Sequence, residues 1–451
     1  MQRIQREPKV SSFLLAGILF FMFFVDFSVI SVNAGTNGFG LQMPWFLCMV
    51  FVVYYVFSLV RDERKLRIKF SKSIITKLFI FFIAVTIIDL IYDRFIYPRA
   101  VVMDTAFTIN GMIDRAIPHT IYLIYIYFSC AFIANFLTTF SDYDDVLYYV
   151  RRYAITWAFF FITIWGIYQF LTTFGLIPYI RIFNNNPSEG FTYERFRNAH
   201  RTSSVFAEPS EYGYYLCFMT PIVVSFVMNR TNLFTLRPTK LNKIIVVGLL
   251  FSQILLTQAF SIYVVLPLVL LISFNMLDIK KRTKVIIDII FAILAVLAVS
   301  FIAVLIARFG AIGARIEAIL NGSDSSVAER FRVLLLGLSI MRGNPLLGMG
   351  YGTFRAMDLF SGMLAYFGIL GMLVFLWFLW RLHVVAKEDR FTNLLFWGYC
   401  SYLLAGCAGN SLFEFMSFWM IPFFIIILSR CKTLKMKKIR TKYSLRKKLF
   451  S

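Results

Sequence analysis

The sequence predicts an all-α membrane protein with about twelve transmembrane helices, and three observations support this fold class. The chain of 451 residues is 59% hydrophobic, contains 52 Phe and 23 Tyr, and has a mean hydropathy of +0.73. Its apolar residues form runs of about 20, the length that a helix needs to cross a hydrocarbon layer roughly 30 Å thick. The runs are continuous and do not alternate with polar residues, so helices are expected rather than the strands of a barrel.

The expected spans form a single integral membrane domain over 1–451. They are 11–32, 41–60, 74–92, 117–139, 153–177, 212–229, 244–259, 260–277, 285–307, 360–380, 394–409 and 412–429. Two of these assignments divide apolar runs that are too long for one helix, 244–277 and 394–429. The small or polar residues Thr257-Gln-Ala-Phe-Ser261 and Gly406-Cys-Ala-Gly-Asn410 are the expected turns.

The distribution of Lys and Arg predicts which side each loop faces. With twelve spans, most of the 46 Lys and Arg fall on one side, together with both termini. Because these residues are retained on the cytoplasmic side, both termini are expected to be cytoplasmic. The net charge of +22 therefore indicates topology, and no nucleic-acid partner is expected. The basic tail at 430–451 is expected to lie on anionic membrane lipid.

Two further features exclude other readings of the chain. All six Cys lie in or beside apolar runs without metal-ligand spacing, so they are interpreted as small core residues with no disulfide framework. The first apolar run follows three cations and could resemble a signal peptide. It is long and lacks a small-residue cleavage site, so it is expected to remain as the first span.

Long connections distinguish the outer side. The expected loops at 93–116, 178–211 and 308–359 exceed what is needed to join helices, and such loops usually carry function. Every cation assigned to this side is Arg and none is Lys. Because the planar guanidinium pairs two oxygens at once, this bias favours a phosphate or carboxylate ligand.

The loop at 178–211 gathers most of the candidate site residues just before an apolar run. They are Arg195, Arg197, His200, Arg201, Glu208 and Glu211. A solvated loop can carry such residues without any function. The alternative is a binding site for an anionic group at the membrane surface.

The loop at 308–359 is expected to contain an amphipathic helix. Ser326-Val-Ala-Glu329 reads as a capping box that opens the helix, and apolar residues then recur at helical spacing, so one face can lie on the membrane or on the bundle. Arg330 and Arg332 fall near the helix N-terminus, which also attracts anions. Gly343-Asn-Pro345 ends the helix, and Gly348-Met-Gly-Tyr-Gly352 gives a chain able to pass close to a ligand.

These segments together resemble the superfamily of O-antigen and capsule polymerases and O-antigen ligases. The resemblance rests on Arg201-Thr-Ser-Ser-Val-Phe-Ala-Glu-Pro-Ser210, on Ser326-x3-Arg330, on Asn344-Pro-Leu-Leu-Gly-Met-Gly-Tyr-Gly352 and on Phe367-Gly-Ile-Leu-Gly371. It covers most of the chain as architecture, but only about 196–214 and 325–372 by motif. It implies a GT-C-like helical bundle with two large periplasmic loops, in the bacterial inner membrane.

The resemblance also implies a reaction and its partners. A glycan on undecaprenyl diphosphate would be transferred to the next lipid-linked repeat unit at the periplasmic face, without a metal or other cofactor. A chain-length regulator protein is a further expected partner. Arg201 and Arg330 would stabilise the departing diphosphate, and Glu208 would either align or deprotonate the acceptor hydroxyl or orient Arg201. The expected substrate-binding residues are Arg195, Arg197, His200, Glu211, Arg332, Gly350 and Tyr351.

Two departures from the family pattern favour a polymerase over a ligase. The turn at Gln258-Ala-Phe-Ser261 lacks the arginine that many relatives carry there, and Met357-Asp358 stands where ligases tend to have His-Asn. Arg181, Arg195 or Arg355 could replace the missing arginine. An O-antigen ligase remains one alternative. A lipid-linked oligosaccharide flippase is the other, although transporters place key charges at the membrane midplane.

Three carboxylates within apolar runs, Asp26, Asp89 and Glu414, are rare features in a membrane span. Asp89 and Glu414 fall near outer ends and can reach water. Asp26 is deeper, and an Arg from an outer loop is its expected partner. None belongs to a recognised motif, so a structural role is the preferred interpretation.

Overall fold

The computed structural model describes most of the chain. It covers residues 9–34, 37–61, 73–92, 109–185, 200–275, 321, 325–353, 356–409 and 412–449. The expected span at 285–307 lies outside the described residues, as do the candidates Arg195, Arg197 and Arg355.

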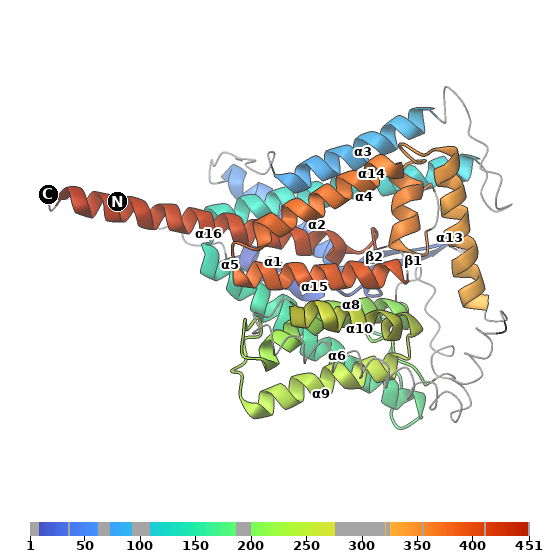
Figure 1. The fold of residues 1–451 in the computed structure, drawn as a ribbon, viewed down its shortest axis with the longest axis horizontal. Coiled ribbons are helices and arrows are strands. Elements are labelled where there is room, and N and C mark those ends of the chain that lie inside the picture. Colours follow the sequence, from blue (N-terminus) through green and yellow to red (C-terminus); the bar gives the residue numbers. More distant parts are fainter. Residues whose placement is uncertain are drawn as a thin grey trace.

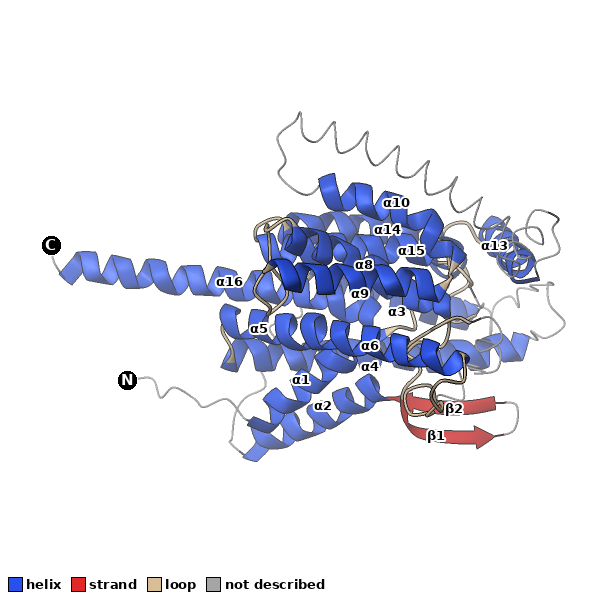
Figure 2. Cartoon of the chain, turned by 90° about the horizontal axis from the view of Figure 1, so that it is seen from below, coloured by secondary structure: helices blue, strands red, loops and turns tan. Residues whose placement is uncertain are grey.

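Most of the described chain is helical, with one two-stranded sheet (Figure 2). The helices are α1 (Lys9–Phe21), α2 (Met43–Arg61), α3 (Ile74–Ile91), α4 (Ile109–Phe140), α5 (Tyr143–Tyr149), the π-helix η3 (Val150–Trp157), α6 (Ala158–Thr173), α8 (Pro209–Val227), α9 (Lys240–Thr257), α10 (Phe260–Asn275), α13 (Ser325–Gly343), α14 (Leu359–Ala386), α15 (Arg390–Cys407) and α16 (Met416–Leu449); the strands are β1 (Ser28–Ala34) and β2 (Asn37–Gln42).

Seven helical segments among the described residues are long and apolar enough to cross a membrane. They are Met43–Arg61, Ile74–Ile91, Ile117–Phe140, Tyr143–Thr173, Lys240–Thr257, Leu359–Ala386 and Met416–Met436. The shorter apolar helices Val10–Phe21 and Ser261–Phe274 lie beside them. The expectation of an all-α membrane protein is therefore confirmed at the level of helical content and of several membrane-spanning helices.

The first expected span, 11–32, is wrong in its second half. The helix ends at Phe21, and Ser28–Ala34 forms a strand that pairs antiparallel with Asn37–Gln42. From Ile30 onward, β-branched Ile30 and Val32 alternate with Ser31 and Asn33, which is the period of a strand rather than of a helix.

Both expected divisions of the long apolar runs coincide with helix ends. α9 ends at Thr257, Gln258 takes a left-handed backbone conformation with φ of 47°, and α10 begins at Phe260. α15 ends at Cys407 and α16 begins at Met416. The basic tail is not a separate segment, because it continues α16, which projects from the bundle at the left of Figure 1.

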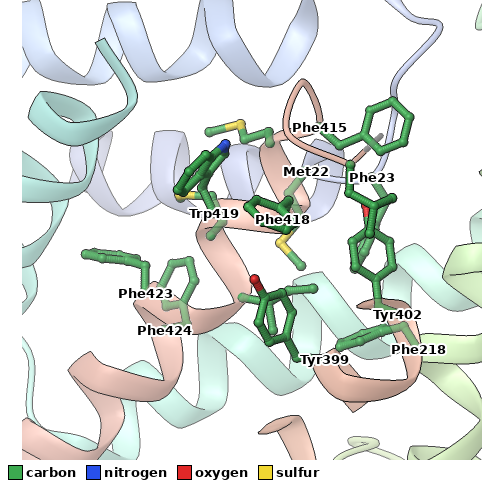
Figure 3. Packing of buried hydrophobic residues seen from close by; sticks show 14 of the residues in the cluster. Met22, Phe23, Phe218, Tyr399, Tyr402, Phe415, Phe418, Trp419, Phe423 and Phe424 are labelled. Carbon is green, nitrogen blue, oxygen red and sulfur yellow. The ribbon is translucent and has the colours of Figure 1, made fainter. Parts of the chain in front are cut away.

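The helices pack around an aromatic core. Figure 3 shows Phe23 beside α1 facing Phe218 of α8, and Phe418 and Trp419 of α16 near Tyr399 of α15. The ring centroids of Phe23 and Phe218 are 5.3 Å apart, and those of Phe418 and Trp419 are 4.8 Å apart in an edge-to-face arrangement. These large buried rings pack the neighbouring helices against one another.

One end of the bundle carries the predicted functional segments. α13, β1 and β2 lie at the end opposite the projecting part of α16 (Figure 1). α13 packs against the start of α14, where a Cβ atom added to Gly337 would lie 3.0 Å from Cβ of Ser361. Of the two orientations expected for the apolar face of α13, the face is directed away from the bundle at Phe331 and Leu335, which are exposed, whereas Val333 and Ile340 are buried.

Candidate functional site

The segment before α8 is held in place by one buried glutamine. The side-chain oxygen Oε1 of Gln169 in α6 accepts hydrogen bonds from Oγ1 of Thr202 at 2.7 Å and from the backbone nitrogens of Ser203 and Ser204 at 2.7 and 2.8 Å. All four residues are buried. The Ser204 nitrogen also donates to Oγ1 of Thr202 at 3.2 Å. Because buried donors need acceptors away from water, Gln169 helps to fix the path of the segment.

Asn184 fixes the same segment from the loop after α6. Its side-chain nitrogen donates to the backbone oxygens of Ser204 and Phe206, at 3.0 and 3.2 Å. Its neighbour Asn185 forms two hydrogen bonds with the backbone of Ser28 at the start of β1. The loop after α6, the hairpin and the segment before α8 therefore form one unit.

His200 and Arg201 lie at the ends of α6 and α9. The imidazole of His200 stacks on Phe174 with ring centroids 4.4 Å apart, and Nδ1 lies 3.3 Å from Oγ1 of Thr173. Arg201 donates from Nε to the backbone oxygen of Thr257 at 3.1 Å. Thr257 is the last residue of α9, so the guanidinium lies at the negative end of a helix dipole.

Glu208 and Arg330 join the two long loops that the motifs marked. Oε2 of Glu208 lies 3.9 Å from Nη2 of Arg330, and Nη1 of Arg330 donates to the backbone oxygen of Ala408 at 3.4 Å. The side chains are 43% and 29% exposed, so both border solvent. The carboxylate expected to serve as a base or to orient Arg201 is thus a neighbour of Arg330. It also accepts a hydrogen bond from Ser210.

Glu211 and Arg332, two expected substrate-binding residues, are engaged elsewhere. Glu211 is buried in the first turn of α8, within electrostatic range of Tyr402 in α15, so it lies inside the bundle rather than at its rim. Arg332 donates from Nε and Nη2 to both oxygens of Glu329, at 2.9 and 2.8 Å. These hydrogen bonds hold the pKa of the Glu329 carboxyl below its ordinary value.

The expected capping box is wrong in detail. The helix begins at Ser325, one residue before the expected cap, and the Glu329 carboxylate binds Arg332. The predicted end of this helix is confirmed, because α13 stops at Gly343.

Gly350 belongs to a glycine-rich loop that fills a break in α14. Helix α14 is interrupted at Gly368, where φ is 64° and ψ is −164°. The backbone nitrogens of Met349 and Gly350 donate to the oxygens of Ala365 and Tyr366, at 2.8 and 2.9 Å. On the other side of the break, the nitrogens of Ile369 and Leu370 donate to residues at the start of the loop. Backbone groups freed by the break are thereby satisfied within the protein, as a membrane requires.

Tyr351 is buried, so it does not offer an open face for a sugar. Its backbone nitrogen donates to Oγ1 of Thr86 at 3.1 Å, and its ring lies edge-on to His119 with centroids 5.0 Å apart. The hydroxyl group has no hydrogen-bond partner among the described residues.

His119 and Glu414 form a side-chain contact near Tyr351 that the sequence does not predict. Nε2 of His119 lies 3.2 Å from Oε1 of Glu414. Glu414 is one of the carboxylates expected near an outer helix end, but His119 belongs to no motif. The only indication in the sequence is that His119, like Glu414, is a titratable residue near the expected outer end of an apolar span. Among the described residues, no group of three or more His, Cys, Asp and Glu is placed to hold a metal ion.

Comparison with protein-family models finds no match for this chain, and comparison with curated proteins finds none either. The function must therefore be inferred from the residues and their geometry.

Proposed function

We propose that the protein is a surface-polysaccharide polymerase, an integral membrane glycosyltransferase of the O-antigen type. It would transfer a growing glycan from undecaprenyl diphosphate to the next lipid-linked repeat unit, at the periplasmic face of a bacterial inner membrane. Both termini would then be cytoplasmic. The observation that carries the proposal is the contact of Glu208 with Arg330, because it joins the two motif-bearing loops at one end of the bundle.

The chemistry requires fixed cations near a leaving diphosphate. When the glycosidic carbon leaves the diphosphate oxygen, negative charge grows on that oxygen, and guanidinium groups held in place stabilise it. Arg330 meets this requirement, since Glu208 and the Ala408 carbonyl hold it while part of its side chain remains exposed. Arg201 is held by the end of α9 at the same end of the bundle.

The surroundings of these arginines suit a lipid-borne substrate. α13 carries Arg330 and exposes the apolar side chains Phe331 and Leu335, so it can lie against acyl chains while its arginine faces the charged headgroup region. The break in α14 and the loop that fills it lie beside α13. The diphosphate of a lipid-linked substrate would lie at the arginine, and its lipid chain would lie against the exposed apolar side chains.

The experiment is deletion and complementation in the source bacterium. Deletion is expected to leave single repeat units on the surface lipid, and the wild-type gene is expected to restore a ladder of longer glycans on a gel. Arg330→Ala is expected not to restore the ladder, although the protein accumulates in the membrane. Unattached polymer in the deletion strain would indicate a ligase instead. Lipid-linked repeats trapped on the cytoplasmic side would indicate a flippase.

A further inference from the structure

Glu414, on the connector between α15 and α16, is held by two residues of α4. Oε1 of Glu414 lies 3.2 Å from Nε2 of His119, and the hydroxyl of Tyr122 donates a short hydrogen bond to the backbone oxygen of Glu414. His119 and Tyr122 are three residues apart, so they lie on one face of α4. The helix therefore holds both the side chain and the backbone of Glu414.

His119 is itself held from behind by the glycine-rich loop. A Cβ atom at Gly352, where φ is 82°, would come within 2.6 Å of Cγ in the imidazole, so a larger residue would displace the ring. Tyr351 packs edge-on against the same imidazole. The imidazole is 27% exposed and the Glu414 side chain 62% exposed. The carboxylate thus faces solvent, supported by a more enclosed imidazole.

The same connector also holds Arg330. At its start the Ala408 carbonyl accepts from Arg330, and near its end Glu414 pairs with His119. Between them, Gly409 lies so close to Tyr214 that an added Cβ would overlap the tyrosine hydroxyl, which ties the connector to α8. The two described ends of this connector therefore carry a contact to the cation proposed to bind the leaving group and an exposed carboxylate.

We infer that Glu414 is the catalytic base of the glycosyl transfer and that His119 is its positioning residue; this rests on the proposed function. The acceptor hydroxyl oxygen forms the new bond to the glycosidic carbon, while the bond from that carbon to the diphosphate oxygen breaks. The diphosphate leaves with the electron pair, and the hydroxyl proton passes to Glu414, which later releases it to water. Glu208 then serves to position Arg330.

This assignment predicts that the extension rate depends on pH through the ionisation of Glu414. The assay uses purified full-length protein and the lipid-linked repeat extracted from the deletion strain, and it follows initial extension rates from about pH 5 to about pH 9. A base must be ionised, so the wild-type rate rises with pH along an acid limb. The titratable groups around Glu414 include His119 and Tyr122 on α4 and Tyr351 in the glycine-rich loop.

Glu414→Gln is expected to lower the rate about 100-fold and to abolish the acid limb. Glu414→Asp keeps the charge and should retain the limb at a reduced rate, which provides a second variant if the glutamine protein folds poorly. Glu388→Gln removes an exposed carboxylate near the start of α15, at the opposite end of the bundle, and should match the wild type.

His119→Phe keeps an aromatic ring against Tyr351 but removes the N–H group that stabilises the carboxylate. Its acid limb should move to higher pH, with much of the rate recovered there, whereas a purely structural role would lower the rate at every pH. If Glu414→Gln had the wild-type rate and the wild-type pH profile, the assignment of Glu414 would be overturned and the proposed function would stand. The same would follow if Glu208→Gln lost the acid limb of the profile while Glu414→Gln kept it. Failure of the wild-type protein to extend the repeat would instead contradict the proposed function.

Discussion

Oε1 of Gln169 lies 2.7 Å from the backbone nitrogen of Ser203, a contact between the interior of α6 and the segment that carries Arg201. The same oxygen also serves Thr202 and Ser204. One side chain thus supplies three of the hydrogen bonds that hold a segment without helix or strand, and Asn184 supplies two more. The position of Arg201 depends on a residue that shares no motif with it.

Gln169→Leu should destabilise the protein. The leucine fills a similar volume but leaves the buried amide of Ser203 and the hydroxyl of Thr202 without this acceptor, at a cost of at least about 2 kcal/mol. Thermal unfolding in detergent would show this as a lower midpoint. Thr163→Val is the matched control, because the Thr163 hydroxyl in the same helix bonds only carbonyls of its own helix. Equal midpoints for the two variants would contradict the anchoring role of Gln169.

Gly368→Ala should disrupt the break in α14. Its φ of 64° and ψ of −164° fall in a region used almost solely by glycine, and an added Cβ would lie 2.4 Å from the backbone carbon of Leu346. We expect a loss of roughly 3 kcal/mol or more. Gly248→Ala, in the middle of α9 with no atom within 4 Å of the added Cβ, should be neutral or stabilising. If the two variants unfold at the same temperature, the break in α14 does not require glycine.

The surroundings of Asp389, at the other end of the bundle, predict that the stability of the folded protein falls in acid. Burial favours a higher pKa for its carboxyl, but hydrogen bonds from Lys432 and Tyr143 outweigh this and hold the pKa below its ordinary value. A lowered pKa in the folded state stabilises the protein above the unfolded pKa, and this stabilisation is lost as the pH falls through the folded value. The loss should therefore occur below about pH 4.

Asp389→Asn tests this dependence. The variant should unfold at a lower temperature than the wild type at pH 7, and the difference should shrink as the pH falls below about 4. Unfolding midpoints in detergent across this range would measure it. Asp144→Asn removes a more exposed carboxylate that pairs with Lys435 on the same helix α16, and it should have little effect. Parallel curves for Asp389→Asn and wild type would contradict the prediction.

The features that the sequence predicted correctly are those with local causes. The break after Thr257 and the end of α13 at Gly343 follow from small, polar or proline residues that interrupt an apolar pattern. The hairpin was missed because its β-branched residues directly continue the apolar run of α1, and hydropathy alone does not separate a strand from a helix there.

The candidate site was predictable only in part, because its contacts join distant segments. The motifs select Arg330 and Glu208 as candidates, but only the folded structure reveals that they are neighbours. The same holds for His119 and Glu414, which come from α4 and from the connector before α16. The contact of Arg332 with Glu329 was not predictable either. From the sequence, either Arg330 or Arg332 on α13 could have faced Glu208.

The contact of Glu208 with Arg330 should matter for activity rather than for stability. At 3.9 Å, with both side chains partly exposed, the pair should contribute less than about 1 kcal/mol to folding, so Glu208→Gln should unfold at the wild-type temperature. Arg330→Ala should raise the reaction barrier by about 3 kcal/mol, as expected for loss of a fixed donor to a developing negative charge. Glu208→Gln should cost less, since the Ala408 carbonyl still holds the guanidinium.

The double variant separates a carboxylate that acts through Arg330 from one that acts independently. If Glu208 only positions the arginine, then Glu208→Gln should lower the extension rate in the wild-type background and have no further effect in Arg330→Ala. The same cycle made with Glu414→Gln should instead be close to additive, because that carboxylate is proposed to act on the acceptor and not on the leaving group. Additive losses for Glu208 and Arg330 would show that Glu208 contacts the substrate itself.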